Sequence, residues 1–185
     1  MIGVLALQGG FAAHGRMLGV LGAGVREVRV PDDLDGLDGL VIPGGESTTM
    51  TLGIEREGLA DPLRALADAG TPILGTCAGL ILLDREHLQI MDIRAQRNAF
   101  GRQVRSFEAD LDIDGIEGPP LRAVFIRAPW IAEHGDDVEI LASVDGHAVA
   151  ARQGALLTVA FHPELGHDTR VHERFVAMCE SRARI

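Results

Sequence analysis

An apolar strand runs directly into a helix in the stretch Ile73-Leu74-Gly75-Thr76-Cys77-Ala78-Gly79-Leu80-Ile81-Leu82-Leu83. A strand-to-helix turn this sharp crowds its neighbours, and Gly75 and Gly79 leave room on both sides of Cys77. The cysteine then projects at the tip of the turn, where the positive end of the helix dipole and nearby N–H groups favour a thiolate. We predict a nucleophile elbow, and the alternative is a buried structural cysteine.

The segments before the elbow alternate between strands and helices. Apolar runs closed by Pro or Gly predict buried strands at residues 2–7, 25–30, 39–42 and 73–76. Helical spacing predicts a helix over 14–21, and a strand-helix-strand unit implies parallel pairing. A further helix is predicted from Asp61 as N-cap, with Pro62 in its first turn and Gly70 as its stop.

After residue 107 the pattern becomes strand-rich. The predicted strands cover residues 109–113, 123–126, 138–144, 148–151 and 156–160, and a final helix covers 169–182. We find no repeat or linker, and 185 residues with 46% apolar content suffice for one core. The sequence therefore predicts an α/β fold: a three-layer, open, mostly parallel sheet flanked by helices, forming one domain over residues 1–185.

Composition restricts the partners and the compartment. The formal net charge of −10 argues against a nucleic-acid or anionic-membrane surface, because such partners need clustered Lys and Arg. The two cysteines, Cys77 and Cys179, lie outside any metal-ligand cluster, which favours a reducing, cytoplasmic setting. Residues 1–10 carry no basic leader, and no apolar run approaches about 18 residues, so we expect neither a secretion signal nor a membrane span.

A base for the thiolate is offered by Phe161-His162-Pro163-Glu164, which follows the last predicted strand. Residues i and i+2 of an extended chain project on the same side, so Glu164 can hold the His162 ring as a triad carboxylate does. Functional crevices of open α/β sheets lie at the carboxyl ends of strands, where both Cys77 and His162 fall. A His-x-Glu by itself is more often a solvated surface feature.

A third segment, Ile42-Pro43-Gly44-Gly45-Glu46-Ser47-Thr48-Thr49, ends the third predicted strand with two glycines. Amide hydrolysis passes through an oxyanion that backbone N–H groups can stabilise. We assign the N–H groups of Gly45 and Ala78 to this oxyanion hole, and a plain Gly-Gly turn is the alternative. A phosphate loop is disfavoured because the segment lacks the lysine of such loops.

Six segments together closely resemble the glutaminase subunits of two-component pyridoxal 5′-phosphate synthases, a family of class I glutamine amidotransferases. They cover residues 3–9, 43–49, 75–79, 97–103, 125–129 and 161–165. The elbow and the His-x-Glu are shared by class I amidotransferases in general. Segments 46–49, 97–103 and 126–129 narrow the resemblance to this family.

The resemblance implies a flavodoxin-like architecture, a triad of Cys77, His162 and Glu164, and no metal or organic cofactor. It implies that L-glutamine is held by Gly44, Gly45, Glu46, Arg97, Ile126 and Arg127. Charge logic agrees, because the α-carboxylate of glutamine suits a guanidinium and its α-ammonium suits oxygen acceptors. Without the family, Arg97, Arg102 and Arg127 would be interpreted as solvated surface charges.

The resemblance also implies a partner, a (β/α)₈-barrel synthase that uses the ammonia to make the cofactor. In relatives, docking on that barrel completes the oxyanion hole, and we place Gln8-Gly9 near the contact, with an ordinary turn as the alternative. Residues 84–96 form a shorter connection than the family usually has, which indicates a truncated loop near the mouth of the active site that does not include the triad.

Three rival functions remain at this stage. The chain could serve a different synthase as a class I amidotransferase subunit, it could be a peptidase-like relative, or it could be a regulatory subunit without activity. The intact set of Cys77, His162 and Glu164 argues against the last, since a subunit without chemistry has no physical need for all three. The remaining histidines (14, 87, 134, 147, 167 and 172) and Cys179 have no catalytic neighbour in sequence and are assigned no function.

Overall fold

The computed structural model describes residues 1–97 and 106–182. Within them, nine strands form the main sheet, in the order β2-β1-β3-β4-β11-β10-β8-β5 with β9 paired to β10. These strands are β1 (Ile2–Leu5), β2 (Val25–Val28), β3 (Gly39–Ile42), β4 (Ile73–Thr76), β5 (Ile93–Gln96), β8 (Trp130–His134), β9 (Glu139–Val144), β10 (His147–Gln153) and β11 (Leu156–Val159). A separate two-stranded ribbon contains β6 (Ser106–Leu111) and β7 (Leu121–Ile126).

The parallel part of the sheet positions the site. Strand β1 pairs in parallel with β2 and β3, β3 pairs with β4, and β4 pairs with β11. The order β2-β1-β3-β4-β11 is the flavodoxin-like doubly wound order, so the predicted class is confirmed. Strands β1, β3, β4 and β11 are buried along their whole length because helices cover both faces.

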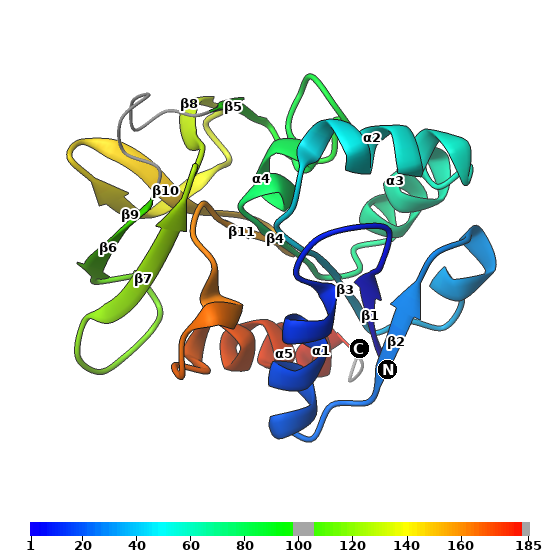
Figure 1. Ribbon diagram of the computed structural model, residues 1–185, viewed down its shortest axis with the longest axis horizontal. Coiled ribbons are helices and arrows are strands. Elements are labelled where there is room, and N and C mark those ends of the chain that lie inside the picture. Colours follow the sequence, from blue (N-terminus) through cyan, green and yellow to red (C-terminus); the bar gives the residue numbers. More distant parts are fainter. Residues whose placement is uncertain (98–105, 183–185) are drawn as a thin grey trace.

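The helices form the outer layers. They are α1 (Phe11–Val20), α2 (Ser47–Arg56), α3 (Ala60–Asp68), α4 (Ala78–Leu83) and α5 (Arg170–Arg182), with short 3₁₀ turns η1 (Pro31–Leu34) and η2 (Pro163–Leu165). Helices α1 and α5 lie on one side of the sheet and α2, α3 and α4 on the other (Figure 1). No helix in the part of the chain that the structure describes is long and apolar enough to cross a membrane.

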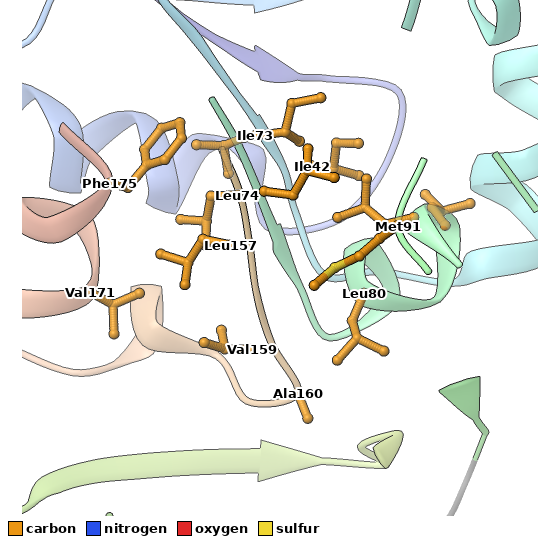
Figure 2. Packing of buried hydrophobic residues seen from close by; sticks show 14 of the residues in the cluster. Ile42, Ile73, Leu74, Leu80, Met91, Leu157, Val159, Ala160, Val171 and Phe175 are labelled. Atoms are coloured by element: carbon orange, nitrogen blue, oxygen red, sulfur yellow. The ribbon is translucent and has the colours of Figure 1, made fainter. Parts of the chain in front are cut away.

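The core fills both sides of the central strands. Figure 2 shows Val171 and Phe175 of α5 on one side, and Leu80 of α4 together with Met91 on the other. All four side chains are at most 1% exposed. Burial of this kind is worth about 1.5–3 kcal/mol for each large apolar side chain, so the layers on both faces fix where the strand ends lie.

The antiparallel part of the sheet extends the parallel part. Strand β10 pairs antiparallel with β11, β8 and β9, and β8 pairs antiparallel with β5. The sequence predicted neither β5 nor β8. Strand β5 is at the edge of the sheet and β8 lies next to it. Both strands are short, and only one residue of each is buried, so neither has the continuous apolar run of a central strand.

Other boundaries differ from the prediction. Helix α1 begins at Phe11, three residues before the predicted start, and α3 begins at Ala60, so that Asp61 lies in its first turn. Pro62 is tolerated there because N–H groups of the first turn have no partner within the helix. Helix α2 was not predicted, because its Ser-Thr-Thr start has low helix propensity. The Glu46 side chain caps it by accepting hydrogen bonds from its first N–H groups.

Candidate active site

Cys77 lies between the end of β4 and the first residue of α4, at φ 49° and ψ −105°. A side chain rarely adopts a positive φ, so the backbone is held in a strained turn by its surroundings. A Cβ added at Gly75 would lie 2.7 Å from Leu83 Cδ1, and one added at Gly79 would lie 3.0 Å from the carbonyl carbon of Ile42 and overlap its oxygen. The predicted elbow geometry, with a glycine on each side, is therefore confirmed.

The imidazole and carboxylate of the candidate triad follow β11. His162 Nδ1 lies 2.8 Å from Glu164 Oε1, and the Cys77 side chain lies close enough to the His162 ring to raise its pKa. Gly44 lies against the side chains of both His162 and Cys77. A Cβ added at Gly44 would lie 2.6 Å from His162 Cε1 and 3.2 Å from Cys77 Cβ. The structure therefore brings the side chains of Cys77, His162 and Glu164 together beside Gly44.

Electrostatics favour a charged ring beside the sulfur. Burial lowers the pKa of His162, but the hydrogen bonds and charges of Cys77 and Glu164 outweigh it and raise the pKa to about 10. Burial raises the pKa of Glu164, but the hydrogen bond from His162 and the facing imidazoles bring it below the ordinary carboxyl value. The pair is therefore arranged to keep a proton on His162 that can be delivered to a leaving group.

The turn at Gly44 and Gly45, which the sequence predicts to carry one oxyanion donor and which we call the oxyanion turn, is fixed by two hydrogen bonds of Gly44. Gly44 N–H donates to Thr76 Oγ1 at 3.0 Å, and the Gly44 carbonyl accepts from Gly10 N–H at 2.9 Å. Because the peptide is planar and trans, the N–H of Gly45 points away from Gly10. Ala78 N–H is the first of α4 and needs no partner inside the helix.

A polar cluster forms the other end of the site. Arg97 Nη2 lies 2.5 Å from Ser47 Oγ and 3.7 Å from Glu46 Oε1. Both oxygens of Glu46 accept hydrogen bonds from the start of α2, at 3.0 Å from Thr48 N and 2.7 Å from Thr49 N. Hydrogen bonds from Thr49 and Thr48 lower the pKa of Glu46 to about 2. Glu46 therefore stays ionised beside Arg97 while it caps the helix.

One pocket of about 460 Å³ collects these groups. Its walls include every residue predicted from the sequence for the site: Gly44, Gly45, Glu46, Cys77, Ala78, Arg97, Ile126, Arg127, His162 and Glu164. The Ile126 carbonyl lies 3.9 Å from Cys77 Sγ, and Arg127 has a positive φ of 45°. Arg102 and the rest of segment 98–103 lie outside the described residues.

Several residues at the site carried little signal in sequence. The Gln8 side chain accepts a hydrogen bond from Glu46 N–H at 2.7 Å and so braces the oxyanion turn. His14 and His172, which the sequence assigned no function, are fully buried behind the triad. The one hint for His14 was its position four residues before Leu18, on the helix face that becomes buried.

The short connection after α4 is held together by one carboxylate. Asp84 is 1% exposed, and its Oδ1 accepts from Glu86 N–H at 2.8 Å and His87 N–H at 3.1 Å. Its Oδ2 accepts from Ala95 N–H at 3.2 Å, which joins the loop to β5. The shortened segment therefore closes on itself and leaves the triad untouched.

A cysteine at a strand-to-helix elbow, paired with His-x-Glu on a flavodoxin-like sheet, defines a class I glutamine amidotransferase. The sequence profile of the SNO glutamine amidotransferase family matches residues 4–181, and the chain belongs to this family. It is 52% identical over 198 residues to the pyridoxal 5′-phosphate synthase subunit PdxT of Acidothermus cellulolyticus, covering 100% of this chain and 96% of the relative. The PdxT of Frankia alni is 52% identical over 189 residues, covering 97% and 95%.

Solved structures agree with this assignment. A crystal structure of a glutamine amidotransferase superposes with a TM-score of 0.91 at 41% identity, covering 97% of this chain and 98% of the other. The structure of PurLQS from Thermotoga maritima contains a chain with a TM-score of 0.72 at 16% identity, covering 95% and 96%. The second likeness concerns the fold alone.

Proposed function

We propose that this chain, acting as one amidotransferase domain over residues 1–185, hydrolyses L-glutamine to glutamate and ammonia as the glutaminase subunit of a pyridoxal 5′-phosphate synthase. The observation that carries the proposal is that Cys77, His162 and Glu164 line one pocket together with Arg97 and Glu46, with His162 hydrogen-bonded to Glu164. The two relatives described above carry the name of that synthase subunit over nearly their full length.

The reaction begins with attack of the Cys77 sulfur on the side-chain amide carbon of glutamine. The amide oxygen becomes an oxyanion, which the N–H groups of Gly45 and Ala78 stabilise; loss of one such donor typically costs about 10²–10³ in rate. The C–N bond then breaks, and His162 gives its proton to the departing nitrogen, so that ammonia leaves and a thioester remains. Water attacks the thioester with His162 as base, which releases glutamate and frees the sulfur.

Glu164 acts through His162. Its Oε1 accepts the Nδ1 proton of the ring at 2.8 Å, so the opposite ring nitrogen faces the sulfur. The main-chain groups of glutamine would lie at the Arg97 end, with the guanidinium toward the α-carboxylate, and with the Glu46 carboxylate and the Ile126 carbonyl available to the α-ammonium. Arg127 belongs to the same wall of the pocket.

The proposed partner is a (β/α)₈-barrel pyridoxal 5′-phosphate synthase subunit in the cytoplasm, which receives the ammonia. The turn at Gln8 and Gly9 supports a contact there, because both residues line the pocket and Gln8 is hydrogen-bonded to Glu46, the residue after the oxyanion turn. A Cβ at Gly9 would lie 2.9 Å from the Gly44 carbonyl carbon, so the two turns cannot move independently. Docking at this turn would act directly on the oxyanion hole.

The test is ammonia release from glutamine by the chain alone and with the barrel subunit. We expect stimulation by this barrel, and stimulation only by a different synthase would reject the partner. Cys77→Ala should abolish glutaminase activity while the complex still makes the cofactor from added ammonium salts; loss of both would show that Cys77 has another role.

A glutamine-analogue electrophile gives an independent check of the nucleophile. It should label Cys77 and leave Cys179 unmodified, because burial raises the pKa of the Cys179 thiol to about 12. Labelling at Cys179 alone would refute the proposed chemistry.

A further inference from the structure

Two buried histidines stand behind the triad and have no part in the reaction described above. His14 belongs to α1 and His172 to α5, the two helices on the same face of the sheet in Figure 1, and both are 0% exposed. Their rings are 5.1 Å apart between centroids, and His14 Nδ1 lies 2.9 Å from His172 Nε2. Burying two imidazole rings costs folding free energy unless their nitrogen atoms form hydrogen bonds.

The second ring nitrogen of His14, Nε2, lies beside two residues at the site. His14 Nε2 lies 3.3 Å from Glu164 Oε2 and 3.1 Å from Thr76 Oγ1. Glu164 Oε2 is buried and has no hydrogen-bond partner of regular geometry within residues 1–97 and 106–182, so this approach is its main polar contact there. Thr76 Oγ1 also accepts the Gly44 N–H. One ring therefore touches both the triad carboxylate and the hydroxyl that holds the oxyanion turn.

The protonation of the two rings follows from their surroundings. The titratable groups facing His14 are Glu164, His162 and His172, and burial lowers the pKa of His14 to about 4 despite the nearby carboxylate. Burial likewise lowers the pKa of His172 to about 3. Each ring thus carries a single N–H at neutral pH. A lone pair on His14 Nε2 would repel Glu164 Oε2, so the proton belongs on Nε2, and Nδ1 then accepts the N–H of His172 Nε2.

We propose that His14 is a positioning residue for the triad, holding the Glu164 carboxylate from its far oxygen and the Thr76 hydroxyl beneath the oxyanion turn. This inference rests on the proposed function, since it assigns His14 a role in the same reaction. With His14 in place, each carboxylate oxygen faces one imidazole, His162 on Oε1 and His14 on Oε2. Removing His14 takes away the polar group nearest Glu164 Oε2 and the ring nitrogen at Thr76 Oγ1, so the carboxylate can rotate away from His162.

The test compares His14→Leu with His14→Gln in the complex with the barrel subunit. Leucine removes the donor, whereas the glutamine amide can place an N–H near the position of Nε2. We expect His14→Leu to lower kcat by roughly 10- to 100-fold while the KM for glutamine changes less than about twofold, because His14 does not line the pocket. His14→Gln should recover most of kcat. The acid limb of the kcat profile should move up by about one pH unit in the leucine variant, because Glu164 loses the electrostatic contact with the His14 ring that favours its ionised form.

Cys179→Ala is the matched control, because it alters a buried side chain on α5, on the same face of the sheet as α1, but away from the triad. It should lower stability without changing kcat. The proposal is overturned if His14→Leu keeps the wild-type kcat, if His14→Gln is as impaired as His14→Leu, or if Cys179→Ala loses kcat to the same extent. Absence of glutaminase activity in the wild-type complex would instead refute the proposed function.

Discussion

Replacing Gly79 with alanine tests how tightly the elbow is packed. An added Cβ would lie 3.0 Å from the carbonyl carbon of Ile42 and 3.4 Å from its Cβ, and it would overlap the carbonyl oxygen. That obstacle is backbone of β3, a central strand that cannot give way as a flexible side chain would. Overpacking costs about 1–3 kcal/mol and sometimes more, against a helix-propensity gain of about 1 kcal/mol. We expect a net loss of about 2 kcal/mol in the free energy of unfolding.

Gly19 of α1 supplies the control, because a Cβ there meets nothing within 4 Å. Gly19→Ala should raise the free energy of unfolding by about 0.5–1 kcal/mol, the ordinary benefit of alanine over glycine in a helix. For a chain of this size, 1 kcal/mol shifts Tm by roughly 2–4 °C, so the two variants should separate clearly in thermal unfolding.

Gly79→Ala should also lower catalytic activity. Relief of the overlap moves the start of α4, which carries Cys77 and the Ala78 N–H, and a displacement of about 1 Å can cost about 10² in rate. We expect Gly79→Ala to lose glutaminase activity and Gly19→Ala to keep it. A Gly79→Ala protein with wild-type stability and wild-type kcat would refute the reasoning, because β3 and α4 could not then be in the contact described.

Three further predictions concern the site and its surroundings. Because burial lowers the pKa of His14 to about 4, the unfolded chain takes up a proton near pH 6.5 that the folded chain refuses. Of the stability lost in urea unfolding between pH 6.5 and 4, about 3 kcal/mol should come from His14 and a further part from His172, whose pKa is also lowered. His14→Gln should flatten the profile by the share of His14, and an unchanged slope would contradict this. Arg97→Ala should raise the KM for glutamine more than it lowers kcat, with Arg97→Lys in between, and steady-state assays showing an unchanged KM would remove Arg97 from substrate binding. Asp84→Ala leaves the N–H groups of Glu86, His87 and Ala95 without their acceptor. It should lower the free energy of unfolding by about 3 kcal/mol in chemical denaturation while kcat stays at the wild-type value. A variant of wild-type stability would show that the loop does not depend on this carboxylate.

The parallel half of the fold could be predicted because its signals are local. Buried parallel strands appear as continuous apolar runs, and strands 39–42 and 73–76 were predicted with their observed bounds. Helix α2 could not be predicted in the same way. Its polar Ser-Thr-Thr start is stabilised by the Glu46 cap and by burial of Met50 and Ile54, and these depend on the rest of the fold.

The residues of the candidate site likewise differ in whether a local sequence pattern could predict them. The elbow at Cys77 and the His162–Glu164 pair have short-range patterns with a mechanical reason, and the structure brings them together. His14 has no such pattern, because its contacts with Thr76 and Glu164 join segments 62 and 150 positions away in the chain. A single buried imidazole at helical spacing looks the same in sequence whether it serves packing or a catalytic carboxylate.

The ordering of these parts along the chain governs when ammonia can first be made. The β1–α1 turn comes first, the elbow follows, and the His162–Glu164 pair comes directly after β11, a strand that pairs with β4 but follows the antiparallel strands β5, β8, β9 and β10 in the chain. During synthesis the sulfur therefore exists long before its base. A nascent or clipped polypeptide ending before β11 would carry a nucleophile without its base, so the fold itself delays glutamine consumption until β11 and the residues after it have emerged from the ribosome.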